Sequence, residues 1–252
     1  MREEAATTRR RHRWVIRAGR LLPTPTGTPF TFCYLVVLLV TSNIQRLAGA
    51  KIAARLLAVS STDADNLVHH PINSLISSAL WLGSKDWLVY AVIFAVAVAP
   101  LERRIGSGWT FAIFASGHVL ATLATEVPMI VALQAGLLPH EAGQWLDVGV
   151  SYGFFATAGA MAIVLVPKQR GWAVAAIDLF IAVIYVTDAP ATLPAGLTFA
   201  GHLIAAHIGM LGWLTWLRRH GYAGTARIGR VREEPGAGEV RPTAALAAPP
   251  AP

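Results

Sequence analysis

The chain has 252 residues, of which 54% are hydrophobic and only 14% charged, and its formal net charge is +7. Soluble domains average about 25% charged residues, so this deficit and a mean hydropathy of +0.51 indicate a polytopic membrane protein. The single cysteine excludes an intrachain disulfide and a cysteine-based zinc site, and we expect no metal or other cofactor. Basic and aromatic residues are not interleaved, which argues against nucleic acid as a partner.

The apolar runs predict an all-α membrane bundle with six transmembrane helices. A basic arm at 1–27 precedes a membrane domain at 28–218, and a tail at 219–252, rich in Gly, Pro and Ala, is predicted to be disordered. A more polar connection at 47–85 is long enough to form interfacial helices. The predicted spans are 28–46, 86–101, 109–133, 146–166, 172–187 and 197–217.

Positive charge orients these predicted spans. Most of the 21 lysines and arginines fall in the arm, the links at 102–108 and 167–171, and the tail, which lie on one side of a six-span protein. Because cytoplasmic segments carry an excess of Lys and Arg, we expect a multi-pass protein of the cell membrane with both termini in the cytoplasm.

Asp147 and Ser151 stand at the start of the predicted fourth span, and His202 and His207 lie inside the sixth. Four residues apart on a helix, the carboxylate and the hydroxyl would share one face. Both spans enter from outside, and Ser151 and His202 each lie about five residues in, or ~7–8 Å deep, whereas His207 lies deeper. Depth therefore favours His202 over His207 as a partner of Ser151.

A serine beside a histidine is the arrangement that nucleophilic catalysis needs. A neutral imidazole, which a low dielectric favours, removes the hydroxyl proton, and backbone N–H groups near a helix N-terminus bind the oxyanion. Asp147 would orient a histidine or, near the oxyanion, would have to be protonated. The alternative is packing, because Gly149, Gly153 and Thr157 are spaced for close helix contact and Ser151 adds an interhelical hydrogen bond.

Other polar residues inside the spans also have two interpretations. His118 and Glu126, eight residues apart, share a face of the third span, and Asp178 lies in the fifth. These groups either form structural pairs with one another or with a histidine of the sixth span, or they line a proton path.

Three motifs resemble the rhomboid intramembrane serine proteases, over residues 29–218. Leu101 to Ser107 resembles the family's L-E-x-x-x-G-S, Gly149-Val150-Ser151 resembles its G-x-S nucleophile motif, and Gly201-His202 with Ala205 and Gly209 resembles its sixth-span pattern. The stretch from Asp147 to Gly153 is similar to that of divergent rhomboid-like proteins of actinobacteria.

The resemblance implies a protease that cleaves transmembrane proteins where a helix end unwinds near the outer face. Ser151 would be the nucleophile and His202 the base, with Asp147, Gly149 and His207 in supporting positions. Two features depart from the family: Tyr152 replaces a glycine, and 86–91 lacks the H-x-x-x-N motif that helps bind the oxyanion. An inactive rhomboid-like protein that binds or chaperones transmembrane helices is therefore the alternative, and a proton-coupled transporter a third hypothesis.

Overall fold

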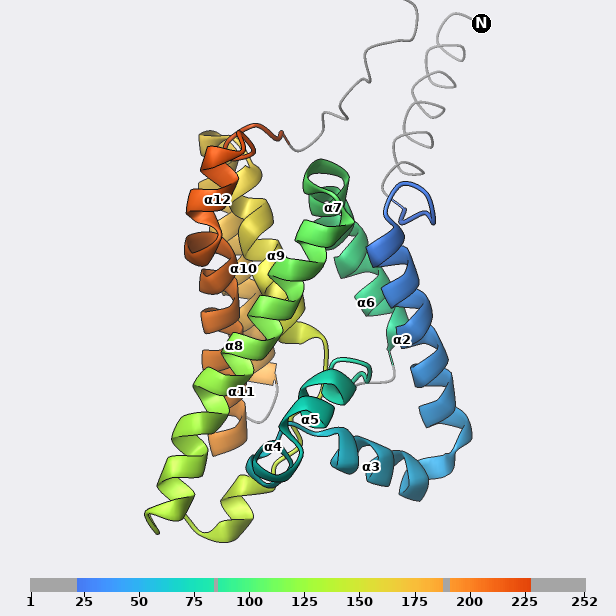
Figure 1. Ribbon diagram of the computed structural model, residues 1–252, viewed down its shortest axis with the longest axis vertical. Coiled ribbons are helices and arrows are strands. Elements are labelled where there is room, and N and C mark those ends of the chain that lie inside the picture. The colour runs from blue at the N-terminus through green and yellow to red at the C-terminus, as the bar shows by residue number, and fades with distance from the viewer. Residues whose placement is uncertain (1–21, 84–85, 188–190, 228–252) are drawn as a thin grey trace, which may run out of the picture.

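The computed structural model describes residues 22–83, 86–187 and 191–227, and in this part of the chain every regular element is a helix (Figure 1). The one β-bridge there joins Leu165 to Ala226. The first helices are α2 (Pro29–Leu47), α3 (Gly49–Ser60), α4 (Ala64–His69) and α5 (Pro71–Ser78). The next stretch is α6 (Trp87–Ile93), a π-helical turn (Phe94–Val98), α7 (Ala99–Ile105) and α8 (Ser107–Gln134).

The second half of the domain consists of three further helical stretches. A short 3-10 turn, η2 (His140–Gly143), precedes α9 (Ser151–Val164) and α10 (Pro167–Thr187). The last stretch is α11 (Leu193–His207), a π-helical turn (Ile208–Gly212) and α12 (Leu214–Arg219).

Four helical stretches of the described chain are long and apolar enough to cross a membrane: Pro29–Leu47, Ser107–Gln134, Pro167–Thr187 and Leu193–Arg219. They correspond to the predicted first, third, fifth and sixth spans, and the prediction of an all-α membrane protein is confirmed. The predicted fourth span contains a helix of only 14 residues, α9. The count of six spans stays a prediction.

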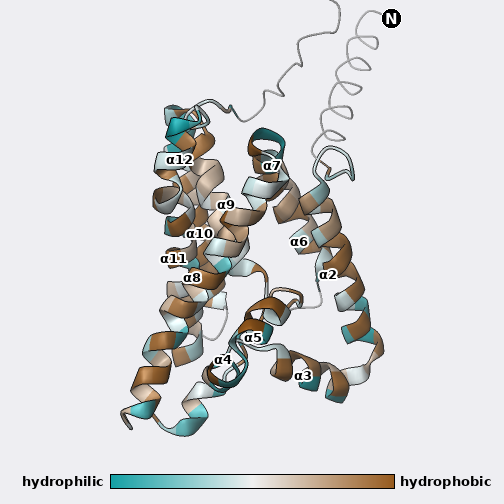
Figure 2. Ribbon diagram, in the orientation of Figure 1, coloured by the Kyte–Doolittle hydropathy of each residue, from teal (hydrophilic) through white to brown (hydrophobic). Residues whose placement is uncertain are grey.

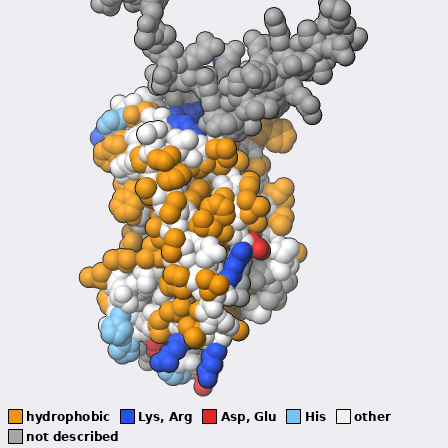
Figure 3. All heavy atoms as spheres, turned by 90° about the vertical axis from the view of Figure 1, so that its right-hand side faces the viewer, with side chains coloured by type: hydrophobic (Ala, Val, Ile, Leu, Met, Phe, Trp, Pro, Cys, Tyr) orange, Lys and Arg blue, Asp and Glu red, His pale blue; other side chains and the backbone are white. Residues whose placement is uncertain are grey.

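Chain connections gather at the two ends of the bundle. The α7–α8 turn, the α9–α10 link and the end of α12 lie at the upper end in Figure 1, and α3, α4 and α5 lie at the lower end. Hydrophobic residues predominate along the helices between these ends (Figure 2), and hydrophobic side chains cover most of the face seen in Figure 3. The prediction that the connection at 47–85 contains helices is confirmed by α3, α4 and α5.

The helix α9 forms the centre of the fold, because all but two of its 14 residues are buried. It packs at very short range on α11 and on the π-helical turn that follows α11: a Cβ atom added to Gly209, in that turn, would overlap the carbonyl group of Ala156. A Cβ at Gly159 would likewise meet the carbonyl of Ala206. Small residues thus let the two backbones touch, as in other membrane bundles.

The L-E-x-x-x-G-S stretch, Leu101 to Ser107, joins α7 to the start of α2 and to the start of α8. Glu102 is buried, and its carboxylate accepts hydrogen bonds from the N–H groups of Phe30 (2.7 Å) and Thr31 (2.9 Å) and from the hydroxyl of Ser107 (2.7 Å). It therefore satisfies two free N–H groups at the start of α2 and complements the positive end of that helix. Gly106, with a φ of 85°, makes the turn between α7 and α8.

The segment after α12 returns to the end of α9. The N–H groups of Gly224 and Ala226 donate to the carbonyls of Ile163 (3.1 Å) and Val164 (2.9 Å), and the N–H of Val166 donates to Ala226 (2.8 Å). Residues 220–227 are thus part of the packed domain, although the tail was predicted to begin at 219. The rest of that tail, and most of the arm at 1–27, lie outside the described residues.

Candidate active site

Ser151 is the first residue of α9 and is half-buried. The residues before it, 144–150, have no regular structure, so the prediction that a helix begins at 146 is wrong. Two features prevent a helix there: Gly149 has a φ of 133°, and its N–H donates to the carbonyl of Ser78 at 3.0 Å. Bonds to a distant segment thus replace the helical ones, and Asp147 and Ser151 do not share a helical face.

Asp147 is fixed by the loop between α3 and α4. Its N–H donates to the Ser61 hydroxyl (3.0 Å), its carbonyl accepts from the Thr62 N–H (2.9 Å), and its carboxylate accepts from the Thr62 hydroxyl (2.8 Å). Burial raises the pKa of Asp147 to about 6, and the hydrogen bond from Thr62 opposes that rise. Asp147 therefore holds the loop that precedes the serine, and within the described residues it makes no hydrogen bond to a histidine.

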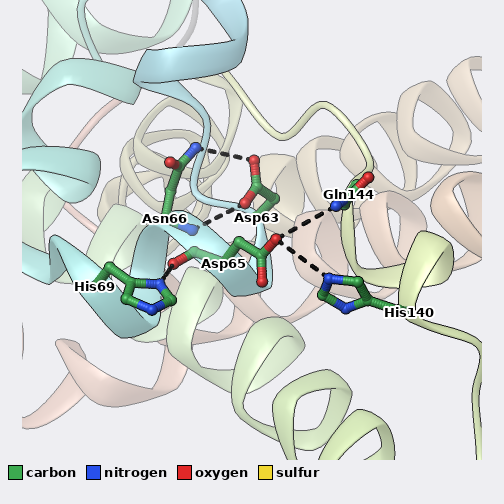
Figure 4. A network of polar contacts seen from close by, with 6 residues as sticks. All are labelled: Asp63, Asp65, Asn66, His69, His140 and Gln144. Atoms are coloured by element: carbon green, nitrogen blue, oxygen red, sulfur yellow. Dashed lines mark hydrogen bonds and ion pairs between the residues drawn. The ribbon is translucent and has the colours of Figure 1, made fainter.

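A polar network involving α4 and η2 stabilises the segment that supports this loop (Figure 4). Asp63 caps α4 by accepting from the Asn66 N–H (3.0 Å), and burial raises the pKa of Asp63. Asp65 lies 3.9 Å from His140 and accepts from Gln144 at 3.4 Å, so α4 is tied to η2 and to the start of the serine loop.

His118 connects α8 to α5, in the same segment. Its Nε2 lies 2.9 Å from the carbonyl oxygen of Leu75 and 3.3 Å from the hydroxyl of Ser78, the residue that binds Gly149. These contacts agree with the structural interpretation of His118. They connect His118 to the serine loop indirectly, because Ser78 in turn accepts the hydrogen bond from Gly149.

His202 lies on α11 with 3% of its surface exposed, against the first turns of α9. Its ring centroid is 4.6 Å from that of Phe155 and 5.5 Å from that of Tyr152. Phe155 follows Ser151 by four residues and so lies one turn along the same face of α9. The imidazole therefore packs on the face of α9 that carries the serine. The sequence analysis did not predict that aromatic residues surround His202. The i, i+4 spacing of Ser151 and Phe155 could have indicated that Phe155 lies on the same face of the helix as the serine.

Tyr152 fills the contact between the two helices. A Cβ added to Gly201 would strike its phenol ring, so the residue before His202 has to be small. The Tyr152 hydroxyl is buried and has no hydrogen-bond partner among the described residues. The tyrosine thus packs beside His202.

Ser151 and His202 are not hydrogen-bonded in this structure. Both ring nitrogens of His202 are buried, and neither has a hydrogen-bond partner in the described part of the chain. Nucleophile-to-base distances in unliganded enzymes are often long and shorten in the complex. No side chain caps the N-terminus of α9, so the first-turn N–H groups there are open to an oxyanion.

Two other residues of the sequence analysis lie away from this site. His207 is exposed on α11, with its Nδ1 2.8 Å from the Leu203 carbonyl oxygen. Asp178 is exposed on α10 and does not pair with His118 or Glu126. The geometry therefore favours His202 over His207 as the partner of Ser151.

Glu126 is the most unusual group near the site. It is completely buried on α8, and neither carboxylate oxygen makes a hydrogen bond of normal geometry within the described residues. The side chain of Trp145 lies near enough to stabilise the carboxylate, whereas Asp147 and Asp63 repel it. Sequence alone showed that Glu126 lies in a predicted span but not that its carboxylate is so weakly paired.

Comparison with protein-family models matches residues 26–219 to the family described as rhomboid-like protein. None of the curated proteins searched matches the chain, and no solved structure matches it either.

Proposed function

The chain belongs to the rhomboid-like protein family, and from that premise we propose that it is an intramembrane serine protease that acts through Ser151 and His202. Its substrates would be transmembrane proteins. We further propose that it resides in the cell membrane with both termini in the cytoplasm, on the basis of the excess of Lys and Arg in the predicted cytoplasmic segments.

One observation supports the catalytic proposal best. The ring of His202 packs 4.6 Å from Phe155, on the serine-bearing face of α9, and both its nitrogens are unengaged. An imidazole held in this way by aromatic rings, and not by hydrogen bonds, keeps its lone pair for the substrate-bound state. In the proposed reaction a ring nitrogen of His202 has to come within hydrogen-bond distance of the Ser151 hydroxyl.

In the proposed reaction His202 accepts the Ser151 hydroxyl proton while the oxygen attacks the peptide carbonyl. The oxyanion is bound by N–H groups of the first turn of α9, since 86–91 lacks the side-chain donors of the family pattern. His202 then donates the proton to the leaving amine, and water releases the acyl group from Ser151 by the reverse proton transfers.

Fluorophosphonate labelling of the detergent-solubilised protein tests the proposal. We expect wild type to be labelled, Ser151→Ala and His202→Ala to lose labelling, and His207→Ala to retain it, because His207 lies on the exposed face of α11. Labelling that survives Ser151→Ala would contradict the proposal, provided that the variants unfold at the wild-type temperature.

A second function is favoured by the missing hydrogen bond between Ser151 and His202 and by the absent H-x-x-x-N motif. In this alternative the protein binds or chaperones transmembrane helices without cleaving them. For this alternative we expect the protein to capture a transmembrane client, and we expect the capture to be unchanged in Ser151→Ala and in His202→Ala.

A further inference from the structure

The outer face of α10 carries a carboxylate at the depth where a membrane tolerates it least. Asp178 is the twelfth of the 21 residues of α10, so about 17 Å of helix separates it from the first residue. It is exposed, and it makes no ion pair with any described residue. An ionisable side chain that faces lipid at mid-depth is costly, and in membrane proteins such groups nearly always find a polar or charged partner.

The helix α10 packs on α9 and α11 with one side only. Only 6% of its most apolar window is buried, against 28–39% for the other three long spans. Ile181 is its one buried residue, and the exposed side chains include Trp172 (80%), Leu179 (66%) and Val186 (66%). A large apolar face is therefore free for lipid or for another helix.

Small residues surround Asp178 on its own face of the helix. Gly171 and Ala175 lie seven and three residues before it and are exposed, and Ala182, half-buried, lies one turn after it. A Cβ atom at Gly171 would meet nothing within 4 Å. Another helix can thus approach the α10 backbone closely enough to reach the carboxylate.

We propose that this face of α10 binds a transmembrane helix of another protein that carries a lysine or arginine at mid-depth, with Asp178 as its counter-ion. Charge complementarity selects the partner, because a basic residue at that depth has the same need of an opposite charge. This inference deepens the proposed function and rests on it, since the helix so selected is the substrate or client.

The position of α10 connects this face to the candidate active site. The contact between α10 and α11 has no room for a water molecule, and the residues on its two sides are Ile184, Tyr185, Ala195, Thr198, Phe199 and His202. A helix bound on α10 would therefore lie beside the helix that covers His202. Asp178 would act in recognition and not in the chemical steps.

The test uses the full chain with Ser151→Ala, reconstituted in vesicles of neutral and anionic phospholipid, so that binding is measured without cleavage. The ligands are three synthetic single-span polyleucine peptides that differ only at the central residue: Lys, Leu or Glu. Energy transfer from a labelled protein to a labelled peptide reports binding. We expect the Lys peptide to bind about tenfold more tightly than the Leu peptide.

Two variants separate recognition of charge from nonspecific hydrophobic association. Asp178→Asn is expected to abolish the advantage of the Lys peptide while leaving the Leu peptide unchanged. Asp178→Lys is expected to reverse the preference toward the Glu peptide. Equal binding of all three peptides to the Ser151→Ala protein would overturn the inference, because an exposed carboxyl that is simply protonated makes no such distinction.

A second copy of this chain is the other occupant that the test detects. Energy transfer between two labelled copies of the protein that depends on Asp178, without any preference for the Lys peptide, would overturn the inference in favour of a homodimer. Failure of fluorophosphonate labelling, in contrast, would contradict the catalytic proposal and leave the peptide preference intact, so the two failures are distinguishable.

Discussion

The helices α9 and α10 follow one another in the chain, are both strongly apolar, and are packed in opposite ways. In α9 all but two residues are buried, and its backbone touches that of α11. In α10 only Ile181 is buried. The difference teaches that hydropathy places a helix in the membrane but does not say whether its neighbours are protein or lipid.

Polar groups follow the same division. Around α9 the loop at 144–150 is held by hydrogen bonds that it donates to Ser61 and Ser78 and accepts from Thr62, and these bonds hold the residues that precede Ser151. On α10 the one carboxylate, Asp178, has no such support. A fixed helix suits a nucleophile, which needs a precise position, and an open helix suits recognition of a partner.

The largest effect is expected from a bulky residue in the α9–α11 contact. Gly209→Leu would place a side chain inside the backbone of Ala156, so we expect it to lose at least about 3 kcal/mol of unfolding free energy or to fail to fold. Thermal unfolding in detergent measures this loss. The matched change on α10, Gly171→Leu, meets no atom and should alter the stability by less than about 0.5 kcal/mol. Similar losses in both variants would remove the contrast between the helices.

The next largest effect is expected at Glu126, where a substitution should raise the unfolding free energy and not lower it. Because both oxygens are buried without a hydrogen bond of normal geometry and face the carboxylates of Asp147 and Asp63, Glu126→Leu is expected to stabilise the protein by roughly 1–3 kcal/mol. The unfolding midpoint of this variant, compared with that of Glu126→Gln, checks it. A lower midpoint for Glu126→Leu would show that the carboxyl has a stabilising partner and would contradict the expectation.

The pH dependence of stability isolates Asp147. Its folded-state pKa, about 6, lies above the ordinary value of 3.8, so folding favours the protonated form. The stabilisation by this group is therefore complete below pH 3.8 and is lost as the pH rises through 6, with a change of roughly 3 kcal/mol. Unfolding midpoints at several pH values in wild type and Asp147→Asn measure it. Parallel curves for the two proteins would contradict the assignment.

The smallest effect belongs to α10. Asp178→Asn in the isolated, detergent-solubilised protein should change the unfolding free energy by less than about 0.5 kcal/mol, because the side chain is exposed and makes no ion pair with a described residue. A loss above 1 kcal/mol in the same thermal measurement would mean that the carboxylate has a partner within its own chain.

The sequence was sufficient where local pattern decides the outcome. Apolar runs located the helices α2, α8, α10 and α11. The structure places His202 against α9, but its role as the partner of Ser151 stays a prediction. The spacing of Leu101 to Ser107 indicated a family motif, although only the structure shows that Glu102 caps α2.

The sequence was insufficient where distant segments meet. The start of α9 at Ser151 depends on bonds to Ser78 and Thr62, which lie far away in the chain, and no periodicity reveals them. The same limit applies to the aromatic packing of His202 and to the lack of partners at Glu126. Exposure of Asp178 was equally hidden, because α10 is as apolar as the spans that are better buried.

The segment at 222–227 has a consequence for the order in which the protein is made. Its N–H groups complete the end of α9 at Ile163 and Val164, yet it is translated after all the other helices of the domain. A chain that ends soon after Arg219 would therefore contain all the helices of the domain but would lack the hydrogen bonds that complete the end of α9. The domain can thus reach its final structure only after residues 222–227 have been synthesised.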